Sequence, residues 1–354
     1  MVGNKDAFGL VIGEHHEEDL EESYNKLWYV PFPEGGLEAL LERKKHVDVS
    51  EGKNCVYVDE FHNVITSILS VNKKIYVGVK PHYEAYAPHP FMEHVPDEIS
   101  NFFELSFGEK KTIKELTVWG EDKYPGFITD IVLFNGRILF GGYTRIFDEY
   151  GNDLCITDEN FWGLQGRGLF DEHVGIDGIG SIIVNDSNNE LFLHVTEDLL
   201  FGFIRHKIIS VVYENGVFKF GDEIQDFNIG HDYRVTTRLL GRDEEDNPLF
   251  LSTIYLDYLS INESKVIGSE FPDFRNPWCY LTVVNNDIKR RKVEILVIRE
   301  HDVEYMRINY KNPKTPKVVE RFSIITGLTG HASALAFVKD KELHNILLEL
   351  KDKS

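Results

Sequence analysis

The apolar positions of the chain recur in paired runs. The first run of a pair is apolar on both faces, as in ITDIVLF and HASALAFV, and a second apolar run follows after a polar turn. A strand that is apolar on both faces loses contact with water on both sides. Later runs such as KVEILVIRE and VEYMRINY alternate instead, as expected of strands with one face in solvent. The six pairs begin at Asn63, Phe127, Gly178, Tyr233, Trp278 and His331.

The six units follow one another roughly every fifty residues, and that spacing of short strands is typical of a β-propeller. We therefore predict an all-β, six-bladed propeller that occupies residues 1–354 as a single domain. Seven blades are the alternative, because the N-terminal segment is long enough to form one more unit. Small residues at the centre of the first strands, such as Thr66, Thr129 and Ser333, suit strands that crowd around one axis.

The two ends of the chain complement each other. The last unit offers two runs, ALAFV and NILLEL, which we interpret as two strands that leave the outer positions of a blade empty. Strand-like stretches at Leu27–Val30 and Cys55–Val58 have no first strand ahead of them. Placing residues 1–61 beside the C-terminal pair closes the ring, and residues 62–354 then supply the repeated blades. Between the two stretches, GLEALLERKKHV from Gly36 predicts a short amphipathic helix.

Composition narrows the class of partner. The formal charge of −21 argues against nucleic acid and against an anionic membrane surface, since both would repel the protein. The three cysteines, Cys55, Cys155 and Cys279, lie far apart without a CxxC pair, so a cytoplasmic, reducing location fits best. Scarce glutamine and abundant charge point toward a thermophile. We expect a monomer or small oligomer whose partner is a small molecule or a protein.

A propeller usually binds its ligand at the mouth of the central channel, where the loops that enter the first strands meet. Polar side chains at these entrances are therefore the candidates for an axial pocket: His62, Asp130, Asp177, His231, Asp232, Arg234 and His331. Imidazoles that converge on an axis suit Zn, Fe or Mn, so His62, His231 and His331 are candidate ligands of a divalent metal ion. Their offsets within the strands differ, which favours a structural or ligand-contacting role for these histidines over a metal site.

The carboxylates at the same entrances allow a second chemistry. Asp130, Asp177 and Asp232 come from three different units, and acids that face each other across a cavity can act on a glycosidic bond. The same oxygen atoms also suit calcium or magnesium. The catalytic residues, and whether the protein is a metal-dependent or carbohydrate-active enzyme at all, stay open at this point.

The repeat pattern resembles the β-propeller superfamily over essentially the whole chain, and it is similar to the uncharacterised single-domain propellers of thermophilic archaea. Gly230-His231 and Gly330-His331 match a dipeptide of Trp-Asp repeats, and Gly141-Gly142 matches the kelch diglycine in one unit. The box of sialidase-like propellers is absent from the sequence, so the resemblance implies a fold and no catalytic residue.

Two hypotheses follow for the function. The first is a propeller with a polar axial pocket for a small ligand, such as a carbohydrate, or for a metal. The second is a non-catalytic interaction scaffold whose acidic surface binds another protein. The concentration of His, Asp and Arg at the blade entrances favours the first hypothesis slightly.

Overall fold

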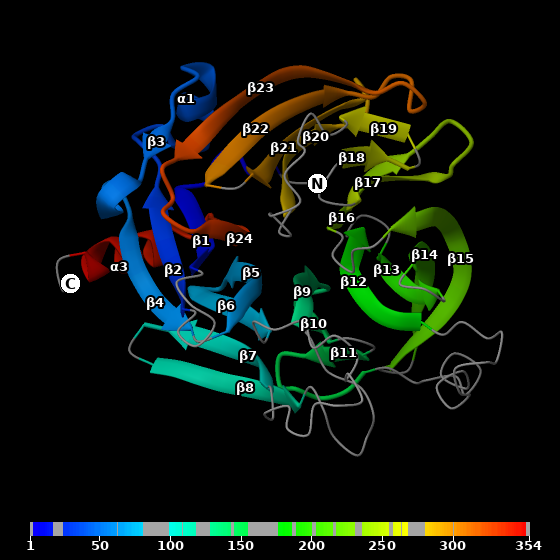
Figure 1. Ribbon diagram of the computed structural model, residues 1–354, viewed down its shortest axis with the longest axis horizontal. Helices are drawn as coiled ribbons and strands as arrows, with labels where there is room; N and C mark the ends of the chain where they lie inside the picture. Colours follow the sequence, from blue (N-terminus) through cyan, green and yellow to red (C-terminus); the bar gives the residue numbers. More distant parts are fainter. Residues whose placement is uncertain are drawn as a thin grey trace.

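The computed structural model describes residues 3–16, 24–61, 63–80, 99–107, 109–117, 128–142, 145–154, 176–185, 189–199, 203–214, 217–230, 236–254, 258–262, 264–267, 280–299 and 301–351. The described strands form six small sheets arranged around a common centre, which is the six-bladed β-propeller predicted from the repeats (Figure 1). No seventh sheet is found among the described residues, because the N-terminal strands complete a blade of the six.

Each blade is named here by its number and its strands are given from the centre outward. Blade 1 contains β24 (His331–Val338), β1 (Gly9–His16), β2 (Tyr24–Pro31) and β4 (Val56–Phe61). Blade 2 contains β5 (Val64–Val71), β6 (Lys74–Lys80), β7 (Ile99–Ser106) and β8 (Glu109–Thr117). Blade 3 contains β9 (Ile128–Phe134), β10 (Arg137–Gly142) and β11 (Arg145–Asp148).

The remaining blades follow in the same direction around the ring. Blade 4 contains β12 (Ile176–Asn185), β13 (Glu190–Leu199), β14 (Phe203–Glu214) and β15 (Val217–Gly230). Blade 5 contains β16 (Thr237–Arg242), β17 (Pro248–Ile254), β18 (Tyr258–Ile261) and β19 (Ser264–Ile267). Blade 6 contains β20 (Leu281–Asp287), β21 (Lys292–Arg299), β22 (Asp302–Asn309), β23 (Lys317–Thr326) and the short parallel β3 (Val47–Asp48).

The ring closes as predicted, with N-terminal strands beside the C-terminal strand, but two details of the prediction were wrong. The run NILLEL belongs to helix α3 (Lys341–Leu350), and the second strand of blade 1 is β1. The carboxylate of Asp340 accepts the N–H groups of Glu342 and Leu343, so the helix starts with a side-chain cap. Leu343 and Leu347, one helical turn apart, are its buried residues.

The expectation of one solvent-exposed face for KVEILVIRE and VEYMRINY was wrong, because β21 and β22 are buried along most of their length. The predicted N-terminal helix does follow the sequence pattern. Helix α1 (Gly36–Glu42) lies where GLEALLERKKHV predicted it, and a short 3-10 helix follows at Ser50–Gly52. Among the described residues, no helix has the length and apolar character needed to cross a bilayer.

The inner strands β24, β5, β9, β12, β16 and β20 lie nearest the centre and contact one another in that order (Figure 1). Their small side chains bridge the blades. The Thr66 hydroxyl of β5 donates to the carbonyl of Ile128 on β9, and the Ser181 hydroxyl of β12 accepts the N–H of Thr237 on β16 at 3.1 Å. The alignment of small residues in the sequence therefore reflects the tight packing around the axis.

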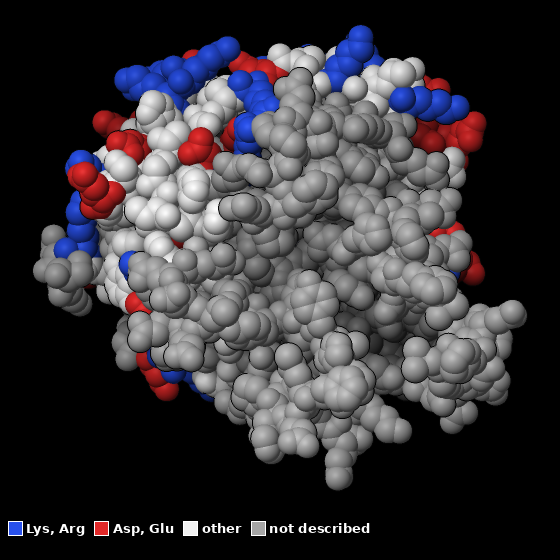
Figure 2. All heavy atoms as spheres, in the orientation of Figure 1, with Lys and Arg blue, Asp and Glu red and all other residues white. Residues whose placement is uncertain are grey.

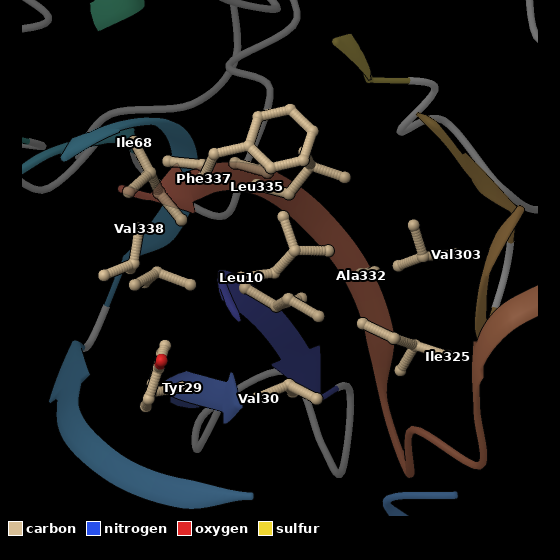
Figure 3. Packing of buried hydrophobic residues seen from close by; sticks show 14 of the residues in the cluster. Leu10, Tyr29, Val30, Ile68, Val303, Ile325, Ala332, Leu335, Phe337 and Val338 are labelled. Carbon is tan, nitrogen blue, oxygen red and sulfur yellow. The ribbon is translucent and has the colours of Figure 1, made fainter. Parts of the chain in front are cut away.

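The largest apolar cluster lies at the seam where the chain ends meet. Figure 3 shows Leu10 of β1 packed with Leu335 of β24. Ile68 of blade 2 and Ile325 of blade 6 belong to the same cluster, so it links three neighbouring blades. Apolar burial is the main stabilising term of a fold, so this cluster stabilises the contact between the two ends of the chain.

Candidate functional site

Asp130 is the third residue of β9 and is buried, with 2% of its surface exposed. One carboxylate oxygen accepts the N–H of Ile131 at 3.0 Å. The other accepts the N–H of Ile182 on β12 at 3.1 Å and an Nη1–H of Arg238 on β16 at 3.2 Å. A single side chain of blade 3 thus contacts the inner strands of blades 4 and 5.

Arg238 extends this network toward blade 6. Its Nη1 also donates to the carbonyl of Thr237 at 2.9 Å, and its Nη2 donates to the hydroxyl of Tyr280, just before β20, at 3.4 Å. Burial disfavours the charged guanidinium, but the Asp130 carboxylate outweighs that effect and holds the pKa of Arg238 above its ordinary value. The side chain keeps 20% of its surface exposed, so its free edge is open to a neighbouring space.

That space is a cavity of about 200 Å³ between three inner strands and the N-terminal segment. Its lining residues are Gly3, Asn4, Ile183, Val184, Arg238, Leu239, Thr282, Val283, Val284, Asn285 and Asn286. At about 30 Å³ per water molecule, it has room for several waters or one small ligand. Because β12, β16 and β20 are inner strands of consecutive blades, the cavity is axial.

Several polar groups of the lining are available for a ligand. Within the described part of the chain, the Thr282 hydroxyl and the Asn285 amide form no hydrogen bond. Nε of Arg238 likewise donates to no described residue. By contrast, Asn286 is occupied, because its amide donates to Leu240 and accepts from Tyr310. The lining therefore presents a guanidinium N–H, a hydroxyl and an amide beside apolar side chains.

The electrostatics favour binding over proton transfer. The charges of Asp130 and Arg238 compensate each other, so the wall carries no net charge at this point. Burial raises the pKa of Tyr280, which keeps the phenol neutral. Burial raises the pKa of Asp130 despite the neighbouring Arg238. Both of its carboxylate oxygens already accept hydrogen bonds, however, so the side chain is engaged in the network and is not presented to a ligand as a general base.

The candidate residues from the sequence have different outcomes. Asp130 is part of the network beside the cavity. His62, His231, Asp232 and Arg234 lie outside the described residues, and the Asp177 side chain does too, although its backbone belongs to β12. Their roles in an axial pocket stay predictions.

His331 lies at the start of β24, as predicted, but among other histidines. Its ring stacks on that of His301 at a centroid distance of 5.0 Å, and it pairs in the sheet with His15 of β1. No group of three or more His, Cys, Asp and Glu side chains suited to a metal ion is found in the described part of the chain. The metal site that includes His62 and His231 stays a prediction.

Sequence reasoning missed Arg238, Tyr280, Thr282 and Asn285. A signal for Arg238 was present, because YRVTTRLL places this cation directly between a small threonine and two leucines of an inner strand. A charge in such a strand requires a buried counter-charge. Asp130 in ITDIVLF is a residue of that kind on another inner strand.

No protein-family model and no curated protein sequence matches the chain. Among solved structures, it is similar to a periplasmic gluconolactonase of Pseudomonas aeruginosa (9% identity, covering 93% of this chain and 98% of that one, TM-score 0.41). It is also similar to an α-L-arabinofuranosidase of Clostridium thermocellum (10% identity, 76% and 95%, TM-score 0.39). A third is the hemagglutinin-neuraminidase ectodomain of parainfluenza virus 5 (8% identity, 87% and 76%, TM-score 0.38). At this level of likeness the activities of these proteins carry no argument about this chain.

The surface bears on the scaffold hypothesis. In the view of Figure 2, Lys and Arg side chains alternate with Asp and Glu along the described part of the rim. Mixed charges of this kind favour no particular partner. Binding of another protein through an acidic face therefore stays a prediction.

Proposed function

We propose that the axial cavity binds a small, uncharged, hydroxyl-rich molecule of about monosaccharide size. The observation that carries the proposal is the free edge of Arg238, which opens onto the cavity while Asp130 and Thr237 hold the rest of the guanidinium in place. A guanidinium fixed in this way loses little conformational freedom when it binds a ligand oxygen.

The lining matches the two kinds of surface on such a molecule. Hydroxyl groups both donate and accept hydrogen bonds, and Arg238, Thr282 and Asn285 supply both donors and acceptors. The C–H faces of the ligand would pack on the apolar side chains of Ile183, Val184 and Leu239.

Charge argues for a neutral ligand. Asp130 already compensates Arg238, and an anion would have to approach a protein with a formal charge of −21. We therefore expect neutral sugars, polyols or sugar lactones to bind more tightly than the corresponding acids or phosphates. Binding alone accounts for the groups present, so no catalytic step is assigned.

The test is a binding screen by thermal shift and calorimetry. The panel contains neutral monosaccharides, polyols and sugar lactones, with gluconate and a sugar phosphate as charged counterparts. Thr282→Val removes the free hydroxyl and keeps the shape of the side chain, and Asn285→Ala removes the free amide. Thr112→Val, at an exposed position of β8, is the matched control.

A neutral compound should stabilise the wild type and the control equally. Each lining variant should weaken its binding about tenfold, which corresponds to the loss of one hydrogen bond. The proposal is wrong if no neutral compound binds the wild type, or if Thr282→Val and Asn285→Ala both bind the ligand as well as the wild type does.

A further inference from the structure

The segment that precedes β1 enters the ring and lies against the inner strand of blade 6. The backbone N–H of Asn4 donates to the carbonyl of Val284 at 2.6 Å, and its side-chain amide donates to the carbonyl of Val283 at 2.6 Å. Both carbonyls belong to β20, the innermost strand of that blade. Carbonyls on the free edge of a strand need partners, and Asn4 supplies two of them.

The segment lies at the end of the channel where the inner strands finish. The cavity residues Ile183 and Val184 are near the end of β12, and Asn285 and Asn286 are near the end of β20. Further along the segment, the N–H of Phe8 donates to Val338, the last residue of β24, at 2.8 Å.

Three separate parts of the molecule hold the segment. Lys339, just after β24, donates from Nζ to the carbonyl of Gly3 at 3.0 Å. The first residues of α1 donate backbone N–H groups to the carbonyls of Lys5 and Ala7. Lys5 also forms an ion pair with Glu294 at 3.1 Å. Anchors from blade 1, α1 and blade 6 fix the position of Gly3 and Asn4 independently of the cavity that these two residues line.

The ion pair of Lys5 begins a ladder across the face of blade 6. Glu294 of β21 pairs with Arg307 of β22 at 3.0 Å, and Arg307 pairs with Glu320 of β23 at 2.8 Å. Lys44, after α1, pairs with Glu320 at 2.7 Å and ends the ladder. The two lysines therefore make equivalent ion pairs, one on the segment that lines the cavity and one near the outer edge of the blade.

We infer that Gly3–Ala7 is a strap that closes this end of the axial cavity, and that Asn4 is a positioning residue for the ligand bound there. The closure stands on the geometry alone, whereas the ligand contact rests on the proposed function. A molecule in the cavity is then covered by the strap at this end, and its release through this end requires the bonds between Asn4 and β20 to break.

The closure is tested without a ligand by labelling a thiol in the cavity. Thr282→Cys places the thiol on the lining, and a Cys279→Ser background keeps the neighbouring cysteine out of the same peptide. Alkylation by iodoacetamide is followed by peptide mass spectrometry in three further backgrounds. Asn4→Asp sets a carboxylate against the carbonyls of β20, Lys5→Glu breaks the ion pair of the strap, and Lys44→Glu breaks the matched ion pair at the far end of the ladder.

Asn4→Asp and Lys5→Glu should raise the labelling rate of position 282 about tenfold or more, because local opening of the strap exposes the cavity. Lys44→Glu should leave the rate within about twofold, because its ion pair is remote from the lining. Circular dichroism and the melting temperature check that each variant folds, and Asn4→Ser supplies a milder change that should give an intermediate rate. Equal labelling in all backgrounds, or acceleration by Lys44→Glu as large as that by Lys5→Glu, overturns the strap.

The ligand contact is tested with whichever panel compound binds the wild type. Asn4→Asp should weaken its binding and speed its dissociation about tenfold, and Lys44→Glu should change neither. If no compound binds the wild type, the proposed function fails while the labelling result still decides the closure. If binding is intact in Asn4→Asp, the ligand contact of Asn4 is wrong and the proposed function stands.

Discussion

The carboxylate of Glu14 accepts the backbone N–H of Gly330 at 2.7 Å, across a separation of 316 residues. The same carboxylate accepts Nε1–H of Trp28 at 2.6 Å and a hydrogen bond from Nε2 of His16 at 3.0 Å. Burial alone would raise the pKa of Glu14, but these hydrogen bonds outweigh it and lower the pKa to about 2. A buried, ionised side chain of β1 thus ties the N-terminal strands to the segment that enters β24.

Acid should weaken this joint. The pKa of Glu14 is lowered on folding, so its stabilising effect is complete above the unfolded value of 4.5 and is lost as pH falls toward about 2. We expect Glu14→Gln to reduce the free energy of unfolding at pH 7 by on the order of 3 kcal/mol. Urea unfolding at pH 7 and at pH 3 checks this, because the difference from the wild type should shrink at the lower pH. A difference that is the same at both values contradicts the role of the ionised carboxylate.

Two equivalent glycines should respond differently to alanine. Gly78 of β6 and Gly141 of β10 occupy matching positions in blades 2 and 3, opposite the third or fourth residue of the inner strand. A Cβ atom at Gly78 would overlap Cγ2 of Ile128, whereas at Gly141 the nearest atom is Oγ1 of Thr129 at 3.3 Å. We expect Gly78→Ala to cost about 1–3 kcal/mol and Gly141→Ala less than about 1 kcal/mol. Chemical denaturation measures the free energy of unfolding of both variants. Equal losses would contradict the prediction that only Gly78 is too close to its neighbour to accept a Cβ atom.

The sequence predicted what depends on local pattern and missed what depends on long-range pairing. The runs ITDIVLF and HASALAFV identified inner strands, because burial on both faces leaves a continuous apolar run. NILLEL has the same apolar content, but Leu343 and Leu347 bury one side of a helix, and β1 takes the place expected for a second strand. The cluster around Glu14 depends on which strands meet at the seam, which no local pattern contains.

The candidate site shows the same division. Asp130 was named as a candidate from its position near a blade entrance, since the repeat predicts where the inner strands begin. Its partner Arg238 lies 108 residues away, and their contact depends on the relative heights of β9 and β16 in the ring. Likewise Asn4 and Thr282 line the same cavity only because the N-terminal segment lies against β20.

A buried histidine pair should make the interface of blades 4 and 5 sensitive to pH. His194 of β13 shares a hydrogen bond with His206 of β14 at 3.2 Å and one with the Thr237 hydroxyl of β16 at 2.6 Å. Burial lowers the pKa of His194 well below 6.5, and the neighbouring His206 adds to that effect. Folding therefore requires the neutral ring, whereas the unfolded chain binds a proton near pH 6.5.

Stability from this pair is complete above pH 6.5 and falls as the solution is acidified below it. We expect the wild type to lose stability between about pH 7 and pH 5, with a steeper slope than His194→Gln, which retains a hydrogen-bonding side chain but cannot take up a proton. Melting curves at intervals of pH measure both slopes. Parallel slopes for the two proteins would show that His194 titrates normally in the folded state.

The ion pair of Asp130 and Arg238 should be strongly coupled. Asp130→Ala leaves a buried guanidinium without its counter-charge, and we expect a loss of about 3–5 kcal/mol in the free energy of unfolding. Arg238→Met leaves the buried carboxylate unpaired and should cost a similar amount. The double variant removes both charges, so it should cost less than the sum of the two single changes by at least about 1 kcal/mol.

Urea unfolding of the wild type, the two single variants and the double variant completes the cycle. Arg290→Met is the control, because Arg290 pairs with Asp287 at 3.6 Å on the surface. Additive costs would mean that the charges of Asp130 and Arg238 do not stabilise each other. The wall of the axial cavity would then carry an uncompensated charge, and the argument for a neutral ligand would fail.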